Sequence, residues 1–188
     1  MWYDSIDKKE LERTGVFILK ITTSDVSLVN PPSYETVLMT FNTAARNCYQ
    51  SLNYKTDNME SAEALARKLI AIGHGSPIEM NNITVRFIGD RNFLAQLSRH
   101  RLLSLAVESA RYCNYSKGKF NHSVSFVKPL GIVTEEQEKI WKESCKKSED
   151  DYFKLLEAGC APETARSVLN TSLATSIIAS ANIREWLS

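Results

Sequence analysis

Apolar side chains recur along the chain with two different spacings. Strand-like runs of β-branched and apolar residues cover positions 16–22, 82–88, 124–127 and 175–179. Helical spacing covers positions 33–49, 62–72, 92–97 with the run that follows, 134–159, 162–169 and 182–188. Strands and helices are interspersed without regular βαβ units and without a long linker. We therefore expect a single α+β domain over residues 1–188, with a small sheet.

Local signals mark several helix ends. Ser33 follows two prolines and is a suitable N-cap for a helix with Val37, Leu38 and Phe41 on one face. In the second helix Ala62, Leu65, Leu69 and Ile72 are expected to point inward, and Gly73 is expected to end it. Thr134 and Gln137 have the spacing of a capping box.

Composition excludes several classes of protein. Of 188 residues, 43% are hydrophobic and 24% charged, and the net charge of +1 gives no global field for nucleic acid or a membrane surface. The four cysteines form no Cys-x-x-Cys pair, which is typical of reduced thiols in the cytoplasm. The first ten residues lack the apolar run of a signal peptide, and no apolar stretch approaches the ~20 residues that span a bilayer.

The most informative stretch runs from Gln96 to Tyr112. Arg99, His100 and Arg101 supply a dense set of donors for phosphate or carboxylate oxygens. The apolar run from Leu102 to Val107 would draw this segment into the core and leave the charges at the rim of a buried site. An isolated Arg-His-Arg is more simply explained by a helix that ends in solvated arginines.

Other chemical signals are weaker. The chain has no Gly-x-Gly-x-x-Gly and no Gly-x-x-x-x-Gly-Lys-Ser/Thr, so a Rossmann or P-loop site is not supported. The histidines lack metal-type spacing, and no metal site is expected. His74, Ser76 and Glu79 share a Gly-rich turn that, taken alone, favours a tight connection. Composition leaves a Ser-His-acid triad open, but no nucleophile elbow is present.

Spacing adds a family resemblance. Arg99-His100-Arg101, seven residues and Ser109 match the Arg-His-Arg-x7-Ser signature of the flavin-dependent thymidylate synthases. Residues 73–79, Gly-His-Gly-Ser-Pro-Ile-Glu, resemble the family's Gly-His-x-Ser/Thr-Pro-Phe-Glu-His loop. Further segments resemble family elements in the family's order: Ala-Ala-Arg-Asn-Cys-Tyr at 44–49, Gly-x-x-x-Glu-x-Ala-Arg-x-x-Leu at 159–169, and Asn-x-Arg at 182–184.

The resemblance implies a fold and an activity. Its members have a small, mostly antiparallel sheet flanked by helices, and form homotetramers with FAD between subunits. They methylate dUMP to dTMP, with methylenetetrahydrofolate as carbon donor and NADPH as reductant. The flavin carries the redox chemistry, and the protein supplies binding and orientation.

Matching positions also imply binding roles. The FAD contacts would be Arg99, His100, Arg101, Leu102, His74, Ser76, Glu79, Asn182 and Arg184. The dUMP contacts would be Gln96, Arg99, Ser109, Arg111 and Arg166. Arg111 and Arg166 offer bidentate donors to a phosphate, and Ser109 would bind rather than act as a nucleophile. No catalytic residue is assigned.

The chain departs from the family pattern at several positions. Ala106 and Val107 stand where the family usually has Asn-Glu, and the nearest acid is Glu108. On a helix, a shift of one residue rotates a side chain by ~100°, so Glu108 need not replace the missing carboxylate. Family members continue beyond the position of Ser188 to an arginine that contacts the uracil ring. We therefore expect an incomplete last helix, from a natural short variant or a truncated sequence.

Two alternatives to the enzyme remain. The first is a non-catalytic FAD- or nucleotide-binding relative that lost turnover with the C-terminal arginine segment and the displaced acid. The second is a basic helix that binds nucleic acid through Arg91, Arg99, Arg101 and Arg111. The second is disfavoured because the net charge is near zero and these arginines are interleaved with leucines.

Overall fold

The computed structural model describes residues 19–54, 58–120 and 122–188. The described chain forms two compact units. The helical unit comprises the described residues up to Thr23 together with Ser109–Ala174, and the sheet unit comprises Ser24–Glu108 with Thr175–Ser188. The expectation of one domain over residues 1–188 stays a prediction, and each unit is described by itself.

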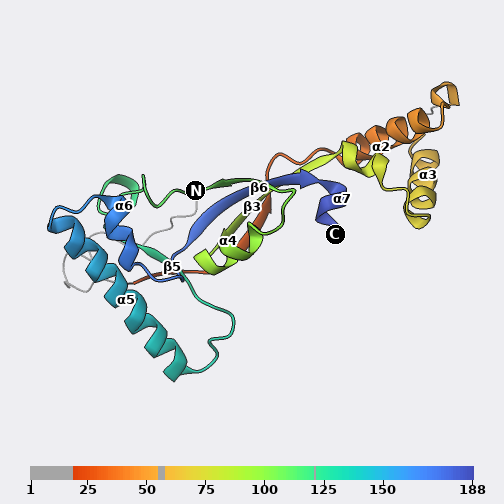
Figure 1. Cartoon of the computed structure of the whole chain (residues 1–188). Helices are drawn as coiled ribbons and strands as arrows, with labels where there is room; N and C mark the ends of the chain where they lie inside the picture. Colours follow the sequence, from red (N-terminus) through yellow and green to blue (C-terminus); the bar gives the residue numbers. More distant parts are fainter. Residues whose placement is uncertain (1–18, 55–57, 121) are drawn as a thin grey trace. The chain divides into compact units, whose positions relative to one another are not determined.

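The sheet unit contains a four-stranded antiparallel sheet in the order β2-β3-β6-β4 (Figure 1). Its strands are β2 (Asp25–Leu28), β3 (Asn82–Gly89), β4 (Ser104–Val107) and β6 (Thr175–Asn182). β3 and β6 pair along their whole length, from Asn82 opposite Asn182 to Gly89 opposite Thr175. The prediction of an α+β fold with a small, mostly antiparallel sheet is confirmed.

Strand alternation gives this sheet one apolar and one polar face. Val85, Ile177 and Ala179 are buried on the apolar face. Phe87 on the same face contacts Phe93 of α4 (Arg91–Leu97), with ring centroids 5.5 Å apart, and Trp186 of α7 (Ile183–Trp186), at 6.4 Å. These two short helices therefore pack on the apolar side of the sheet.

Hydroxyl groups line the opposite face. There Thr84 Oγ1 donates to Ser180 Oγ at 3.0 Å, and Arg86 Nε donates to Ser176 Oγ at 3.1 Å. These bonds join side chains about a hundred positions apart in the sequence. They therefore reinforce the same β3–β6 register that the backbone ladder sets.

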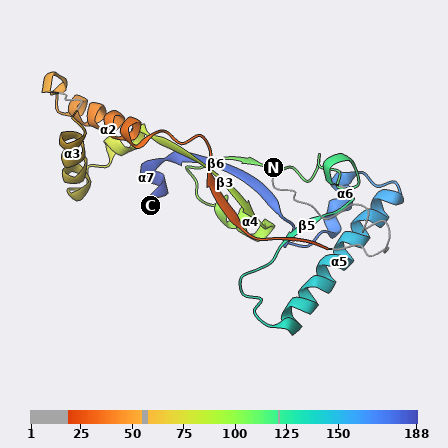
Figure 2. The same ribbon diagram turned by 180° about the vertical axis from the view of Figure 1, so that it is seen from behind.

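The helix pair α2 (Tyr34–Cys48) and α3 (Met59–Ala71) belongs to the same unit, and the two helices lie side by side in both views (Figures 1 and 2). Leu38, Phe41 and Leu69 are in their shared core. The Ser33 hydroxyl accepts a hydrogen bond from the Thr36 amide at 3.1 Å, which confirms the predicted N-cap.

The predicted stop of α3 at Gly73 is also confirmed. Gly73 adopts φ +77°, and the next amide, of His74, bonds the Leu69 carbonyl at 2.8 Å. Ile72 was expected to point inward, but its side chain is 63% exposed, and that expectation is wrong. α3 ends at Ala71, so Ile72 lies beyond the helix and leaves its spacing. The buried residues of α3 are Ala62, Ala66 and Leu69.

The central stretch is not continuously helical, and here the sequence-based expectation is wrong. α4 ends at Leu97, and Ser104–Val107 form the edge strand β4, paired with β6. The Glu108 amide continues this ladder by donating to the Ser176 carbonyl at 2.9 Å. The ~100° rotation between neighbouring side chains on a helix therefore does not apply to Val107 and Glu108. In a strand, neighbouring side chains point to opposite faces.

The helical unit contains α5 (Glu135–Glu157), α6 (Pro162–Ala165) and the parallel strand pair β1 (Lys20–Thr22) and β5 (Ser125–Val127). The capping box of Thr134 and Gln137 is confirmed, with both reciprocal hydrogen bonds formed. Buried Val124, Phe126 and Tyr152 lie in the core of this unit.

Several predicted bounds change in the structure. The helix expected over residues 162–169 ends at Ala165 and gives way to a 3₁₀ turn, Arg166–Val168, while the last helix has only four residues. The strand expected at 175–179 extends to Asn182, because it pairs with β3 throughout. Of the strand expected at 16–22, residues 16–18 lie outside the described residues. β2 was not predicted, and all four of its residues are exposed.

Two further short 3₁₀ turns cover Leu52–Tyr54 and Gly118–Phe120. The described helices include none with the length and apolar character needed to cross a membrane.

Two lysines lower the pKa of one carboxyl group on α5. Glu138 receives hydrogen bonds from Lys128 and from Lys142, the latter at 2.6 Å. These two ammonium groups lower the pKa of Glu138 from its ordinary 4.5 to about 2. The Glu138 side chain therefore stays ionised well into the acid range and ties the chain after β5 to α5.

Candidate functional site

The Gly-rich turn and the last helix meet in the sheet unit. Ser76–Met80 form a 3₁₀ turn, and Glu79 Oε1 pairs with Arg184 Nη1 at 2.5 Å. Gly75 lies against the same guanidinium group, since a Cβ added there would be 3.0 Å from Arg184 Nε. Three residues of two separate motifs are thus brought together.

His74 of this turn is held by Tyr49. The Tyr49 hydroxyl lies 3.0 Å from His74 Nδ1, and the two rings stack with centroids 5.6 Å apart. Both side chains are exposed. Tyr49 stands in the resembling 44–49 segment, but sequence reasoning gave it no role, because the stack depends on where α2 ends relative to the turn.

Asn182 and Ser76 differ in their availability. Asn182 is the N-cap of α7, and its Oδ1 accepts a hydrogen bond from the Glu185 amide at 2.9 Å. That oxygen is therefore engaged in the fold. Ser76, in contrast, is exposed, and its hydroxyl has no protein partner among the described residues.

The Arg-His-Arg segment follows α4 as a turn. The Arg99 and His100 amides bond the carbonyls of Gln96 and Leu97, at 3.0 and 3.1 Å, and these bonds close the helix. Gln96 and residues 99–102 are all exposed, with Leu102 at 72%. Within the described chain, Arg99, His100 and Arg101 make no side-chain ion pair or hydrogen bond. Their side-chain donors therefore face solvent, whereas the sequence predicted that they would lie at the rim of a buried site.

In the helical unit, the two predicted phosphate-binding arginines converge on one residue. Arg111 Nε lies 3.9 Å from Glu163 Oε2, and Arg166 Nε donates to the Glu163 backbone carbonyl at 3.2 Å. The Arg111 and Glu163 side chains are 60% and 58% exposed. Such a weak, solvated pair can be broken by a competing anion at little cost.

Ser109 begins the turn that carries Arg111. Its hydroxyl accepts a 3.4 Å hydrogen bond from the Arg111 amide, and its carbonyl accepts one from the Cys113 amide at 3.0 Å. Ala110 between them is buried and anchors the turn in the core. The order Ser-Ala-Arg therefore places a hydroxyl and a guanidinium group on either side of a fixed residue.

The sequence therefore indicated most of the side chains that make these contacts, but not which residues of the chain they pair with. It missed Glu163 and Tyr49 as partners, although both stand within quoted motifs. It also missed Asn81, which is buried and whose Nδ2 donates to the Val37 carbonyl at 3.1 Å. The only available signal was the position of the first two inside family-like segments. For the part of the chain that is described, no group of three or more His, Cys, Asp or Glu residues is placed to hold a metal ion.

The fold and these clusters define an α+β protein with exposed guanidinium groups in each of its two units. Comparison with known proteins makes the assignment specific. Residues 34–188 match the family model described as thymidylate synthase complementing protein. The chain therefore belongs to that family.

Curated relatives agree with this assignment. A flavin-dependent thymidylate synthase of Geobacter sulfurreducens is 30% identical over 150 residues, 77% of this chain and 63% of that protein. One from Thermococcus kodakarensis is 36% identical over 121 residues, 63% of this chain and 48% of that protein. The chain thus spans less than two thirds of the length of these curated relatives.

The fold has a counterpart among solved structures. The UMP/dUMP methylase PolB from Streptomyces cacaoi, solved with 5-Br dUMP, superposes with a TM-score of 0.72 at 23% identity. The match covers 89% of this chain and 76% of that one. At this identity, the likeness supports the shared fold.

Proposed function

We propose that this protein is an FAD-dependent thymidylate synthase that methylates dUMP to dTMP. Methylenetetrahydrofolate would supply the carbon and NADPH the reducing equivalents. The proposal rests on the family match over residues 34–188 and on the names of the matched relatives. The observation that carries it furthest is the convergence of Arg111 and Arg166 on Glu163.

The dUMP phosphate would replace Glu163 as the partner of these arginines. A phosphate presents several strong acceptor oxygens, and two guanidinium groups can donate to it in parallel. The Ser109 hydroxyl would add a third donor. Gln96 and Arg99 are further proposed dUMP contacts, on the basis of the family motif alone.

The exposed donors of the sheet unit fit a flavin dinucleotide. Arg99, His100 and Arg101 have side-chain nitrogens without protein partners in the described chain, as a diphosphate-binding segment requires. Leu102, His74, Ser76, Glu79, Asn182 and Arg184 are the other proposed FAD contacts. When bound, the flavin would supply the hydride chemistry, while these residues would bind and orient it.

Binding gives the first test of this division of roles. Arg111→Ala should weaken dUMP by at least about tenfold, because it removes a charge-assisted hydrogen bond, and should leave FAD affinity unchanged. Arg67→Ala is the matched control, since Arg67 is also an exposed arginine paired with a glutamate. Equal losses of dUMP and FAD affinity in Arg111→Ala would contradict the assignment.

Turnover is tested separately by dTMP formation from dUMP, methylenetetrahydrofolate, NADPH and FAD. One structural observation favours the alternative of a binding protein without turnover. Val107 occupies the family's acid position and lies opposite Ile177 on the apolar face, whereas Glu108, one residue on, alternates to the other face. Tight binding of FAD and dUMP with no dTMP would establish that alternative.

Assembly and location are also proposals. We propose a cytoplasmic homotetramer with its sites at subunit interfaces and with no nucleic-acid or membrane partner. Light scattering of the purified protein tests the assembly, and a mass of one chain in the presence of FAD would contradict it. Steep, salt-dependent DNA binding would instead support the nucleic-acid alternative.

A further inference from the structure

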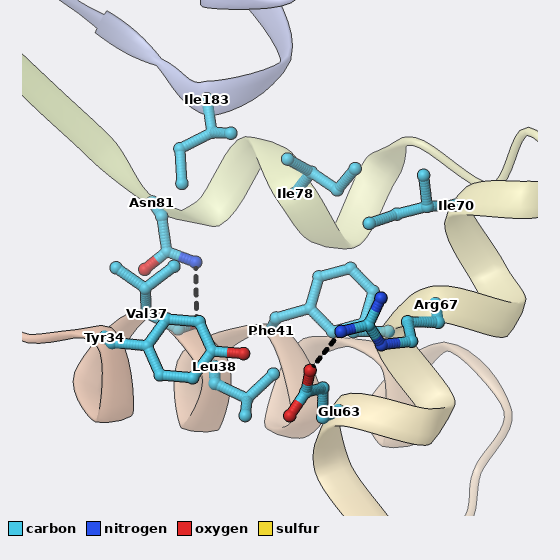
Figure 3. A pocket seen from close by; sticks show the side chains of 11 residues that line it. Tyr34, Val37, Leu38, Phe41, Glu63, Arg67, Ile70, Ile78, Asn81 and Ile183 are labelled. Carbon is cyan, nitrogen blue, oxygen red and sulfur yellow. Dashed lines mark hydrogen bonds and ion pairs between the residues drawn. The ribbon is translucent and has the colours of Figure 1, made fainter.

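The sheet unit contains a pocket that none of the proposed FAD or dUMP contacts lines. It lies between α2, α3, the 3₁₀ turn Ser76–Met80 and the start of α7, and has a volume of about 220 Å³. Figure 3 shows its walls, which are mostly apolar and include Val37, Leu38, Phe41, Ile70, Ile78 and Ile183. Contact with such walls favours an apolar body in any occupant.

Polar groups occur mainly at one side of the pocket. Arg67 Nη2 pairs with Glu63 Oε1 at 2.5 Å, and the Tyr34 hydroxyl points toward this pair (Figure 3). The Arg67 side chain is 78% exposed, so it can move to meet a ligand. Asn81 also lines the pocket, but its amide is already bonded to the Val37 carbonyl.

Arg67 has unused hydrogen-bond donors at this side of the pocket. A guanidinium group has five N–H donors and no acceptor, and only Nη2 of Arg67 has a protein partner among the described residues. The Tyr34 hydroxyl likewise makes no hydrogen bond to another described residue. One oxygen of Glu63 is engaged by Arg67. An occupant that brings acceptor atoms can use these donors of Arg67, and an anion brings the strongest acceptors.

We propose that this pocket binds a small aromatic monocarboxylate. The planar ring would lie among the isoleucines and Phe41, and the carboxylate would take the unused donors of Arg67 and the Tyr34 hydroxyl. The size is appropriate, because an apolar cavity of about 150 Å³ already holds benzene. None of its lining residues is a proposed FAD or dUMP contact, although Ile78 and Ile183 belong to the same elements as some of those contacts. The proposal does not depend on the proposed function.

Isoleucine methyl groups provide a direct readout, with benzoate as the ligand tested. In methyl NMR spectra of the full chain, benzoate should shift Ile70, Ile78 and Ile183 with a Kd of about 1 mM. Ile178 is the internal control, because it is exposed on the polar face of the sheet and does not line the pocket. Benzamide has the same shape without the charge and should bind at least about tenfold more weakly.

Matched variants test the role of the guanidinium group. Arg67→Gln should weaken benzoate about tenfold and bring it to the level of benzamide. Lys68→Gln removes a cation from the same helix but from outside the pocket, and should change nothing. Ala66→Leu fills space at the pocket wall and should abolish the shifts, while an unchanged melting temperature would confirm that it folds.

Three results would overturn the proposal. The first is the absence of saturable shifts at the three pocket isoleucines. The second is equal affinity for benzoate in the Arg67→Gln variant and the unmodified chain. The third is displacement of benzoate by FAD with the same methyl shifts, which would make the pocket part of the cofactor site.

Discussion

Gly89 is the position at which one added methyl group should disturb both stability and the Arg-His-Arg segment. It ends β3, is buried, and lies against Phe93 of α4. A Cβ at this position would be 3.0 Å from Phe93 Cγ and 3.3 Å from Phe93 Cβ, and closer still to Cδ1. Ordinary carbon contacts begin near ~3.5 Å, so the Phe93 ring must move.

The cost follows from what confines that ring. Phe93 packs on Phe87 at 5.5 Å, and its amide is fixed by the Asp90 side chain at 2.7 Å. Overpacking at such a site costs about 1–3 kcal/mol. For Gly89→Ala we expect a loss of about 2 kcal/mol in the free energy of unfolding, which corresponds to about 4–8 °C in melting temperature for a chain of this size.

Urea unfolding followed by circular dichroism measures this loss. Gly131→Ala is the matched control, because a Cβ there meets nothing within 4 Å, and it should leave stability within about 1 kcal/mol of the unmodified chain. Gly89→Ala should also weaken FAD binding, since α4 carries the residues that lead into Arg99. Unchanged stability of Gly89→Ala would show that Phe93 repacks freely and would refute the reasoning.

Three further predictions concern the Gly-rich turn at residues 73–79 and α5. Gly75→Ala should push the Arg184 guanidinium aside and lower FAD affinity in a titration, with little change in melting temperature because the ion pair it disturbs is exposed. Tyr49→Phe keeps the ring stack but removes the hydroxyl that orients His74, and should weaken FAD about three- to tenfold; unaltered affinity would argue against that role. Because the folded-state pKa of Glu138 is about 2, against an ordinary 4.5, its lysine pairs stabilise the fold above about pH 4.5 and are lost as the pH falls toward 2. The difference in melting temperature between Glu138→Gln and the unmodified chain should therefore vanish over this range, and a constant difference would contradict the assignment.

The sequence by itself determined the features that depend on neighbours a few positions apart. The cap at Ser33, the capping box at Thr134 and the stop at Gly73 each use groups within one helical turn. The alternation along residues 82–88 likewise reports a half-buried strand directly. Composition bounded the class of protein, and motif spacing indicated the family.

Tertiary structure decided whatever depends on a distant partner. Ser104–Val107 is a strand only because β6 supplies its hydrogen bonds from about seventy positions away along the chain. Its apolar run was therefore misread as helix. Glu79 meets Arg184, and Arg111 meets Glu163, through the same long-range folding. Sequence patterns carry the chemical type of each side chain, but pairing between remote segments fixes which donors are engaged and which stay free for a ligand.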